Sequence, residues 1–338
     1  MIDRLRDAGY RSLQSVVVLG AQQISQDIHI GMESSERICS LASTKLRDSA
    51  RKIKDVPDLY SSQFHTIIHI PTGSRALDYY LGGGIELGAE SEFLGKSASG
   101  KTQLCHTLSV TSQVSQLKFP SRSTNEDRLN KVIYIDTEGT FRSQRVHQIA
   151  CARGLEGEEI ISNIILLECY SIFEQEQCLK LICELLDKDK SIVLIIIDSV
   201  IVHFREEYSG RSSLPERQQR LNKYLTVLSK IARIYQVAVI MTNQVQSIPS
   251  DPAYSYNMEN STGGNILSHI STHRICLNRP FHEKIYAKII KSPYHSSAAP
   301  DARFVITEKG IDDLEDELHM LFPPNQPATS VKSPFTSN

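Results

Sequence analysis

A glycine-rich segment that ends in a lysine and a threonine occupies residues 95–102 and has the sequence GKSASGKT. Its spacing matches G-x-x-x-x-G-K-S/T, the pattern of the P-loop. In a P-loop the backbone N–H groups bind phosphates, the lysine reaches the β- and γ-phosphates, and the hydroxyl of the Ser or Thr binds a Mg²⁺ ion. The alternative is a chance glycine-rich turn. Residues 92–94 favour a strand and 103–108 a helix, whose N-terminus also attracts phosphate, so we predict nucleoside triphosphate binding. The predicted contacts are Gly95, Lys96, Ser97, Ala98, Ser99, Gly100, Lys101, Thr102 and Gln103.

Polar side chains follow three other apolar runs. Asp198 ends the run 192–197 and suits a carboxylate on the metal side of the nucleotide, whereas Glu138, just past Asp136 at the end of 132–135, suits a group that orients the attacking water. Gln244 follows the run 237–241 and could sense the γ-phosphate. Carboxylates at strand ends are also common structural caps, and Gln244 could equally cap the next loop, so both interpretations stay open.

The elements that would position these residues form an alternating pattern. The runs 132–135, 192–197 and 237–241 are continuous and rich in β-branched residues, which is typical of strands buried on both faces of a parallel sheet, and helical stretches lie between them. We therefore predict an α/β domain over residues 67–322. Residues 1–47 favour a small helical unit and 48–66 a linker, while the polar, proline-containing segment 323–338 is predicted to be disordered.

Composition limits the class of protein. The 338 residues are 40% hydrophobic and 22% charged, and no apolar run is long enough to cross a bilayer. The seven scattered cysteines favour reduced thiols in an intracellular protein. With a net charge of −2, any nucleic-acid site requires a local concentration of positive charge.

Five motifs occur in an order that resembles the RadA-type archaeal and eukaryotic recombinase branch of the RecA family. They are residues 93–103, 134–142, 208–211, 242–245 and 263–266. The resemblance implies a RecA-like P-loop ATPase core with a mostly parallel sheet flanked by helices, preceded by a small helix-hairpin-helix-like domain. That domain begins without its expected first hairpin, so we expect it to be shortened.

The resemblance also implies a function. Relatives bind ATP and Mg²⁺ between subunits, form helical filaments or rings on single-stranded DNA and exchange strands with a homologous duplex, with accessory mediators as further partners. We expect no membrane association, and a location in the cytoplasm with the nucleoid in an archaeon or in the nucleus of a eukaryote. A recombinase paralogue that binds ATP without exchanging strands is the alternative, and a RecA-fold motor unrelated to DNA is a third.

The resemblance also implies roles for individual residues, because each stands at a matching position of a family motif. The resemblance implies that Lys101 and Thr102 hold phosphate and Mg²⁺, that Asp198 holds the metal's water shell, and that Glu138 directs the attacking water. Gln244 would couple the γ-phosphate to a second DNA loop at about 246–262, and His269 would sense the γ-phosphate, although by itself His269 is an ordinary helix histidine.

Two loops would contact DNA. In the first, arginines suit phosphate oxygens through their planar donors, although a solvated charged helix is the alternative. The second loop has no lysine or arginine and would act by stacking and through its backbone. The residues expected to contact DNA are Arg205, Arg211, Arg217, Arg220, Val245, Ile248, Tyr254, Gly263 and Gly264.

The sequence departs from the family pattern at two places. Where relatives insert a linker phenylalanine into the next subunit, either Tyr60 or Phe64 would provide the apolar anchor for polymerisation. Lys291 stands where relatives on this branch usually have an aspartate, and we expect it to act across the subunit interface on the γ-phosphate.

Overall fold

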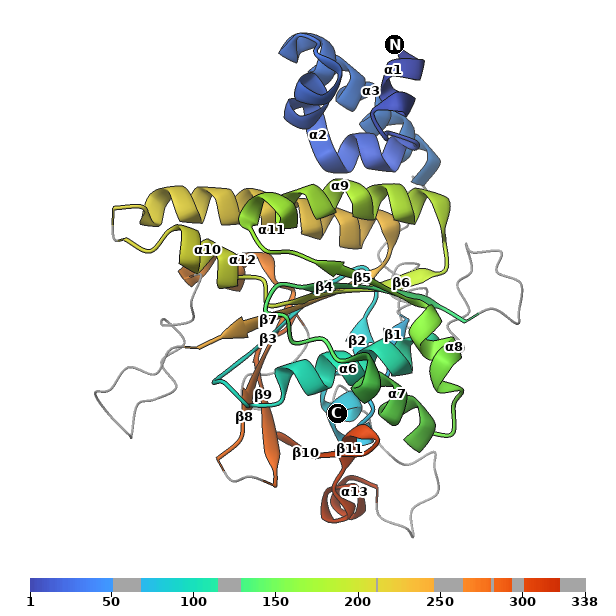
Figure 1. The fold of residues 1–338 in the computed structure, drawn as a ribbon, viewed down its shortest axis with the longest axis vertical. Helices are drawn as coiled ribbons and strands as arrows, with labels where there is room; N and C mark the ends of the chain where they lie inside the picture. The colour runs from blue at the N-terminus through green and yellow to red at the C-terminus, as the bar shows by residue number, and fades with distance from the viewer. Residues whose placement is uncertain are drawn as a thin grey trace, which may run out of the picture.

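The computed structural model describes residues 1–50, 68–114, 129–210, 212–245, 264–280, 283–293 and 301–322. In these segments three N-terminal helices lie beside a larger α/β core (Figure 1). The predicted linker, apart from residues 48–50, and the predicted tail lie outside the described residues. None of the helices in the described segments is both long and apolar enough to span a membrane. All seven cysteines are free thiols, as the sequence predicted.

The core is built on a nine-stranded sheet with the order β11-β10-β9-β8-β3-β7-β6-β4-β5. The six strands from β8 to β5 are parallel, and β9, β10 and β11 add to one side in antiparallel fashion. The mostly parallel sheet is therefore confirmed. The strands are β3 (Glu90–Gly95), β4 (Lys131–Asp136), β5 (Ile164–Glu168), β6 (Ile192–Asp198), β7 (Ala238–Gln244), β8 (His273–Asn278), β9 (Ile285–Lys291), β10 (Ala302–Thr307) and β11 (Gly310–Asp313).

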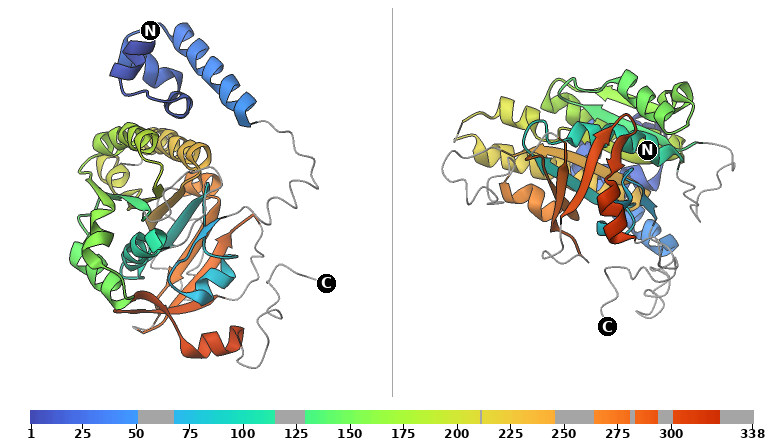
Figure 2. Two further views of the ribbon diagram at one scale, coloured as in Figure 1. Left: turned by 90° about the vertical axis from the view of Figure 1, so that its right-hand side faces the viewer. Right: turned by 90° about the horizontal axis from the view of Figure 1, so that it is seen from below.

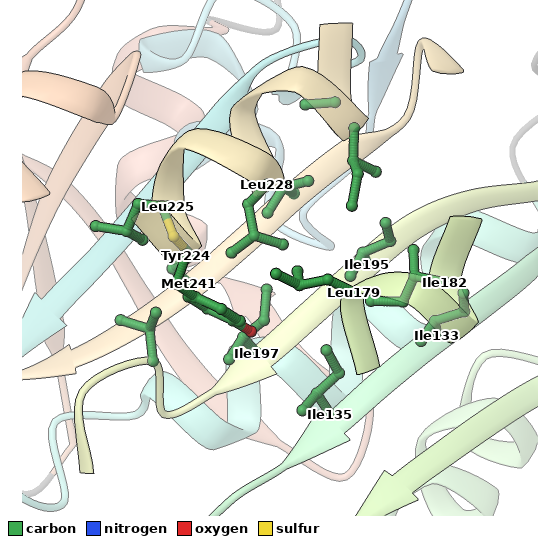
Figure 3. Close-up of a cluster of buried hydrophobic side chains, with 14 of the residues drawn as sticks. Ile133, Ile135, Leu179, Ile182, Ile195, Ile197, Tyr224, Leu225, Leu228 and Met241 are labelled. Carbon is green, nitrogen blue, oxygen red and sulfur yellow. The ribbon is translucent and has the colours of Figure 1, made fainter. Parts of the chain in front are cut away.

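Helices cover both faces of the sheet, because successive strand residues point to opposite sides. In β4, Ile133 and Ile135 pack under α9 and α11, whereas Val132 and Tyr134 pack on the α6 side. Figure 3 shows the first of these clusters, and Figure 1 shows the two helical layers. The first layer contains α9 (Ile172–Lys188), α10 (Val202–Glu207), α11 (Leu214–Tyr235) and α12 (Gly264–Ile270), and the second α6 (Lys101–Val114), α7 (Ser143–Ala152) and α8 (Gly157–Ser162).

Short elements complete the core. A two-stranded ribbon pairs β1 (His69–Ile70) with β2 (Ile85–Glu86), and α5 (Arg75–Tyr80) lies between them in the sequence. The last described helix is α13 (Glu315–Leu321). These pieces pack against the second cluster.

The N-terminal unit consists of α1 (Ile2–Asp7), α2 (Leu13–Ile28) and α3 (Met32–Ala50), so its last helix continues beyond the predicted boundary at residue 47. It lies outside the α9–α11 layer (Figure 2). Ser12 Oγ donates to Asp187 at 2.6 Å, and Lys180 Nζ lies 2.7 Å from Asp27, so polar contacts join this unit to the core.

Candidate functional site

The loop between β3 and α6 has the shape of a phosphate cradle. A Cβ added at Gly95 would lie 2.5 Å from the carbonyl oxygen of Leu277, so no side chain fits there. Gly100 has φ +100°, and a Cβ there would lie 2.7 Å from Ile285 Cδ1. Ala98 adopts φ 60°, a left-handed conformation that costs about 1–2 kcal/mol for a residue with a Cβ. The loop thus holds a backbone shape that only small residues permit.

Lys101 and Ser99 place polar groups at this cradle. The Lys101 ammonium donates to the carbonyls of Gly95 and Lys96 at 3.0 and 2.9 Å. Burial lowers the pKa of Lys101, while the nearby carboxylates of Asp198 and Glu138 raise it. The buried Ser99 hydroxyl has no hydrogen-bond partner among the described residues. An unpaired buried donor beside a lysine fits the oxygens of a triphosphate.

Asp198 is held at the end of β6 by two hydroxyl groups. The Tyr134 hydroxyl donates to Asp198 Oδ2 at 2.9 Å, and Thr242 Oγ1 donates to Oδ1 at 2.5 Å. The described residues contain no group of three or more His, Cys, Asp or Glu side chains able to hold a metal. Mg²⁺ that binds with a nucleotide usually keeps phosphate oxygens and several waters as ligands, and Thr102 and Asp198 are the residues of this site that would complete such a set.

Asp136 shapes the segment that carries Glu138. Its carboxylate accepts hydrogen bonds from the backbone N–H groups of Glu138, Thr140 and Phe141 at 3.1, 3.1 and 2.9 Å. The sequence reading gave Asp136 no role in the site, although an aspartate followed by a threonine- and glycine-containing turn is a pattern in which the side chain bonds nearby backbone. Asp136 thus fixes the position from which Glu138 extends.

Glu138 and Gln244 come together beyond the end of β4 and at the end of β7. Gln244 Nε2 lies 3.4 and 3.5 Å from the two carboxylate oxygens of Glu138. Desolvation raises the pKa of Glu138, and the charge of Asp198 raises it further, against the opposing effect of Lys101. A carboxylate with a raised pKa beside a polar cavity can accept a proton from water.

The sheet register explains this convergence. Asp136 pairs with Asp198 across β4 and β6, and Gly95 pairs with Gln244 across β3 and β7, so four neighbouring parallel strands end at one edge. A cavity of about 470 Å³ lies there, lined by residues that include Asp136, Glu138 and Gln244. Ligands of parallel α/β sheets bind at this carboxyl edge.

His269 and Lys291 lie apart from these strand ends. His269 is exposed on α12. Lys291 Nζ donates to the carbonyl oxygens of Ser268, His269 and Ser271 at 2.7, 3.1 and 2.7 Å. Lys291 thus binds the C-terminal end of α12 within its own chain, and the expected contact with a neighbour's nucleotide would require it to leave these carbonyls. That contact stays a prediction.

The arginines expected to bind DNA have different surroundings. Arg217 forms no ion pair with another described residue, whereas the Arg220 guanidinium binds both carboxylate oxygens of Glu176 at 2.8 and 2.9 Å. Arg220 is therefore neutralised by α9, which differs from the expectation that its charge faces DNA. Arg205 on α10 lies near enough to Glu138 to lower its pKa.

The remaining predicted contacts divide into two groups. Val245 follows β7 directly, with its N–H bound to the Gly95 carbonyl at 3.2 Å, and Gly264 begins α12. Both DNA-contact predictions are untested. Six predicted residues lie outside the described part of the chain: Tyr60, Phe64, Arg211, Ile248, Tyr254 and Gly263.

Comparison with known proteins agrees with this geometry. Residues 63–314 match the family model described as Rad51. The chain is 37% identical over 322 residues to the DNA repair and recombination protein RadA of Cenarchaeum symbiosum (strain A), covering 94% of this chain and 77% of the relative. It is 35% identical over 320 residues to the protein of the same name from Metallosphaera sedula, covering 94% and 93%.

The matched segment, residues 63–314, includes the P-loop and the strand ends that meet at the carboxyl edge. The match therefore covers most of the α/β core and not the P-loop alone, which many unrelated ATPases share. The chain belongs to the Rad51 family, the RadA-type recombinases with a RecA-like core.

Proposed function

We propose that this chain is an ATP-dependent DNA recombinase of recombinational repair, with ATP hydrolysis coupled to binding of single-stranded DNA. The observation that carries the proposal is the arrangement at the carboxyl edge of the sheet. There Glu138 and Gln244 lie within 3.4 Å of each other beside the phosphate cradle. A carboxylate and an amide so placed can respond together to the γ-phosphate and to the segment that follows β7.

The chain's own residues divide the work of hydrolysis. The cradle backbone, Lys101 and Ser99 bind the phosphates of ATP, and Glu138 accepts a proton from the attacking water. A bound Mg²⁺ ion, held through Thr102 and the water shell of Asp198, would neutralise phosphate charge. In this proposal the contact between Gln244 and Glu138 depends on whether the γ-phosphate is present.

DNA contact would occur on the side of the sheet that carries α10 and α11. Arg205 and Arg217 would bind phosphate oxygens without reading sequence, which suits a protein that acts on any homologous pair of strands. The backbone of Val245 and Gly264 would border the second DNA contact. The proposal has further parts. The chain would form filaments through Tyr60 or Phe64, exchange strands with a homologous duplex and bind mediators, and His269 would sense the γ-phosphate. It would act in the cytoplasm or the nucleus.

The test is ATP hydrolysis with and without single-stranded DNA, measured on the wild type and on Glu138→Gln. We expect stimulation by DNA in the wild type, and its loss in the variant while DNA binding persists, because the amide cannot accept the proton. Glu168→Gln is the matched control, since Glu168 lines the same cavity at the end of β5. The control should retain DNA-stimulated turnover.

The outcomes separate the two candidate functions. Stimulated turnover that disappears in Glu138→Gln alone would support the recombinase, and strand exchange would then be assayed with a labelled duplex. Turnover indifferent to DNA would refute DNA-coupled hydrolysis and favour a non-recombining paralogue.

A further inference from the structure

Polar and charged side chains on four neighbouring strands lie between the end of β7 and α12. In the sequence, β7 ends at Gln244, and α12 (Gly264–Ile270) is followed by β8. In the sheet, β9, β8, β3 and β7 are consecutive neighbours (Figure 1). Side chains on these strands can therefore connect the end of β7 to Lys291 at the end of β9, and Lys291 contacts α12.

The central contact is a buried ion pair. Arg274 Nε on β8 donates to Glu92 Oε2 on β3 at 2.6 Å, and the two side chains are 3% and 0% exposed. They are register partners, so they lie on the same face of the sheet. Removing one partner of such a pair leaves an uncompensated buried charge, which destabilises the fold.

The pair extends to β7 through Asn243. Asn243 Nδ2 donates to Glu92 Oε1 at 2.8 Å, and Asn243 is completely buried. Asn243 precedes Gln244, the residue whose amide lies against Glu138. Glu92 thus fixes the backbone immediately before the Gln244 side chain.

The opposite end of the line is Lys291. It is the register partner of Arg274 across β8 and β9, and its ammonium binds three carbonyl oxygens at the end of α12. A cation at a helix C-terminus compensates the unpaired carbonyls of the last turn. Glu92 also offsets the repulsion between the neighbouring Arg274 and Lys291 charges, since it lies near enough to act on both.

We propose that Asn243, Glu92, Arg274 and Lys291 form a positioning connector that holds α12 in a fixed relation to the end of β7. The coupling part of this inference rests on the proposed function: the connector would make the nucleotide contact of Gln244 depend on the position of α12. None of the four side chains touches the reacting atoms in this role. They act through Gln244 at one end and through α12, which carries His269, at the other.

The first experiment needs neither nucleotide nor DNA. Hydrogen exchange of the full chain would be followed in α12 (Gly264–Ile270) and at the end of β7. One variant is the double substitution Glu92→Leu with Arg274→Met, which removes both charges and leaves neither unpaired, so that folding is retained. The second is Lys291→Met, at a partly exposed position, with Lys291→Arg as its conservative rescue.

A remote ion pair provides the matched control. Arg303 on β10 lies 2.5 Å from Glu317 on α13, and its register partner on β9 is Tyr286, at the end of that strand away from Lys291. We expect exchange in α12 to rise at least about tenfold in the double variant and in Lys291→Met, with recovery in Lys291→Arg. Arg303→Met with Glu317→Leu should leave exchange in α12 unchanged. Unchanged protection in both connector variants, or an equal rise in the control, would overturn the connector.

The second experiment measures ATP turnover at saturating single-stranded DNA. We expect the double variant to lose at least about tenfold in DNA-stimulated kcat while its KM for ATP stays within twofold, a split that a general loss of structure would not produce. If the wild type itself is not stimulated by DNA, the proposed function fails, and the exchange data still decide whether the connector exists. If the wild type is stimulated and the double variant equally so, the coupling role is overturned.

Discussion

Replacing Asp136 by asparagine tests whether the segment bearing Glu138 must be held by a carboxylate. Asp136 accepts three backbone N–H groups at 2.9–3.1 Å and is 3% exposed. An asparagine keeps one oxygen, which can still serve Glu138 and Thr140, but presents an NH₂ group to the Phe141 N–H. One charge-assisted hydrogen bond is lost and one donor is left unsatisfied.

The magnitude follows from that single contact. A hydrogen bond to a charged group contributes about 1.5–3 kcal/mol. If all of it is lost from the state in which Glu138 is correctly placed, kcat falls by about 10- to 150-fold, because each 1.36 kcal/mol is a factor of ten. The free energy of unfolding should fall by no more than about 3 kcal/mol.

The assay is ATP hydrolysis at saturating ATP and DNA, with urea unfolding of the same samples. Asp189→Asn is the matched control, because Asp189 also accepts a backbone N–H, from Ser191 at 2.9 Å, but lies just before β6 at the opposite edge of the sheet. Turnover of Asp136→Asn within twofold of the wild type would refute the reasoning, as would an equal loss in Asp189→Asn.

Four other substitutions probe the phosphate cradle, two arginines and a buried histidine. Gly100→Ala should weaken binding of a fluorescent ATP analogue about 5- to 30-fold, since a Cβ at φ +100° costs about 1–2 kcal/mol; unaltered affinity would contradict this. Arg217→Ala should reduce the slope of log K for DNA binding against log salt concentration by about one unit. Arg220→Ala should leave that slope unchanged and should destabilise the fold by about 1 kcal/mol, because the ion pair with Glu176 is lost. Equal slopes for the two variants would refute the distinction. Burial lowers the pKa of His106 to about 4, so the native state binds fewer protons than the unfolded chain between pH 6.5 and 4. The free energy of unfolding should therefore fall by about 3 kcal/mol as the pH drops through that window. In urea titrations His106→Gln should flatten that fall, and an unchanged pH profile of the variant would count against this prediction.

Much of the core was predictable because its signals are local. The P-loop match fixed the cradle, and the β-branched runs before Asp136, Asp198 and Gln244 identified three central strands. Together with β3 before the P-loop, those runs are four of the six parallel strands, whereas β5 and β8 were not predicted. Helix α2 gave no comparable signal, because it is bent at Gly20, which adopts φ 80° within it.

The hydrogen-bond and ion-pair partners of the site residues could not be predicted from such local signals. Tyr134 and Thr242 hold Asp198 from positions 64 and 44 residues away, and the order of β4, β6 and β7 alone brings them together. The sequence offers no sign that Arg220 faces Glu176, since many carboxylates could neutralise an arginine in a charged segment.

The sequence by itself determined the chemistry available to this chain: a phosphate cradle, a carboxylate past one strand and an amide past another. These follow from residue type and short spacing, which need no knowledge of distant segments. Only the tertiary structure decided which charges remain available for a ligand. Lys291 binds α12, and Glu92 pairs with Arg274, a residue 182 positions away, because strand order and register place those side chains on one face of the sheet. Register is set by the packing of the whole core, so no local pattern could reveal it.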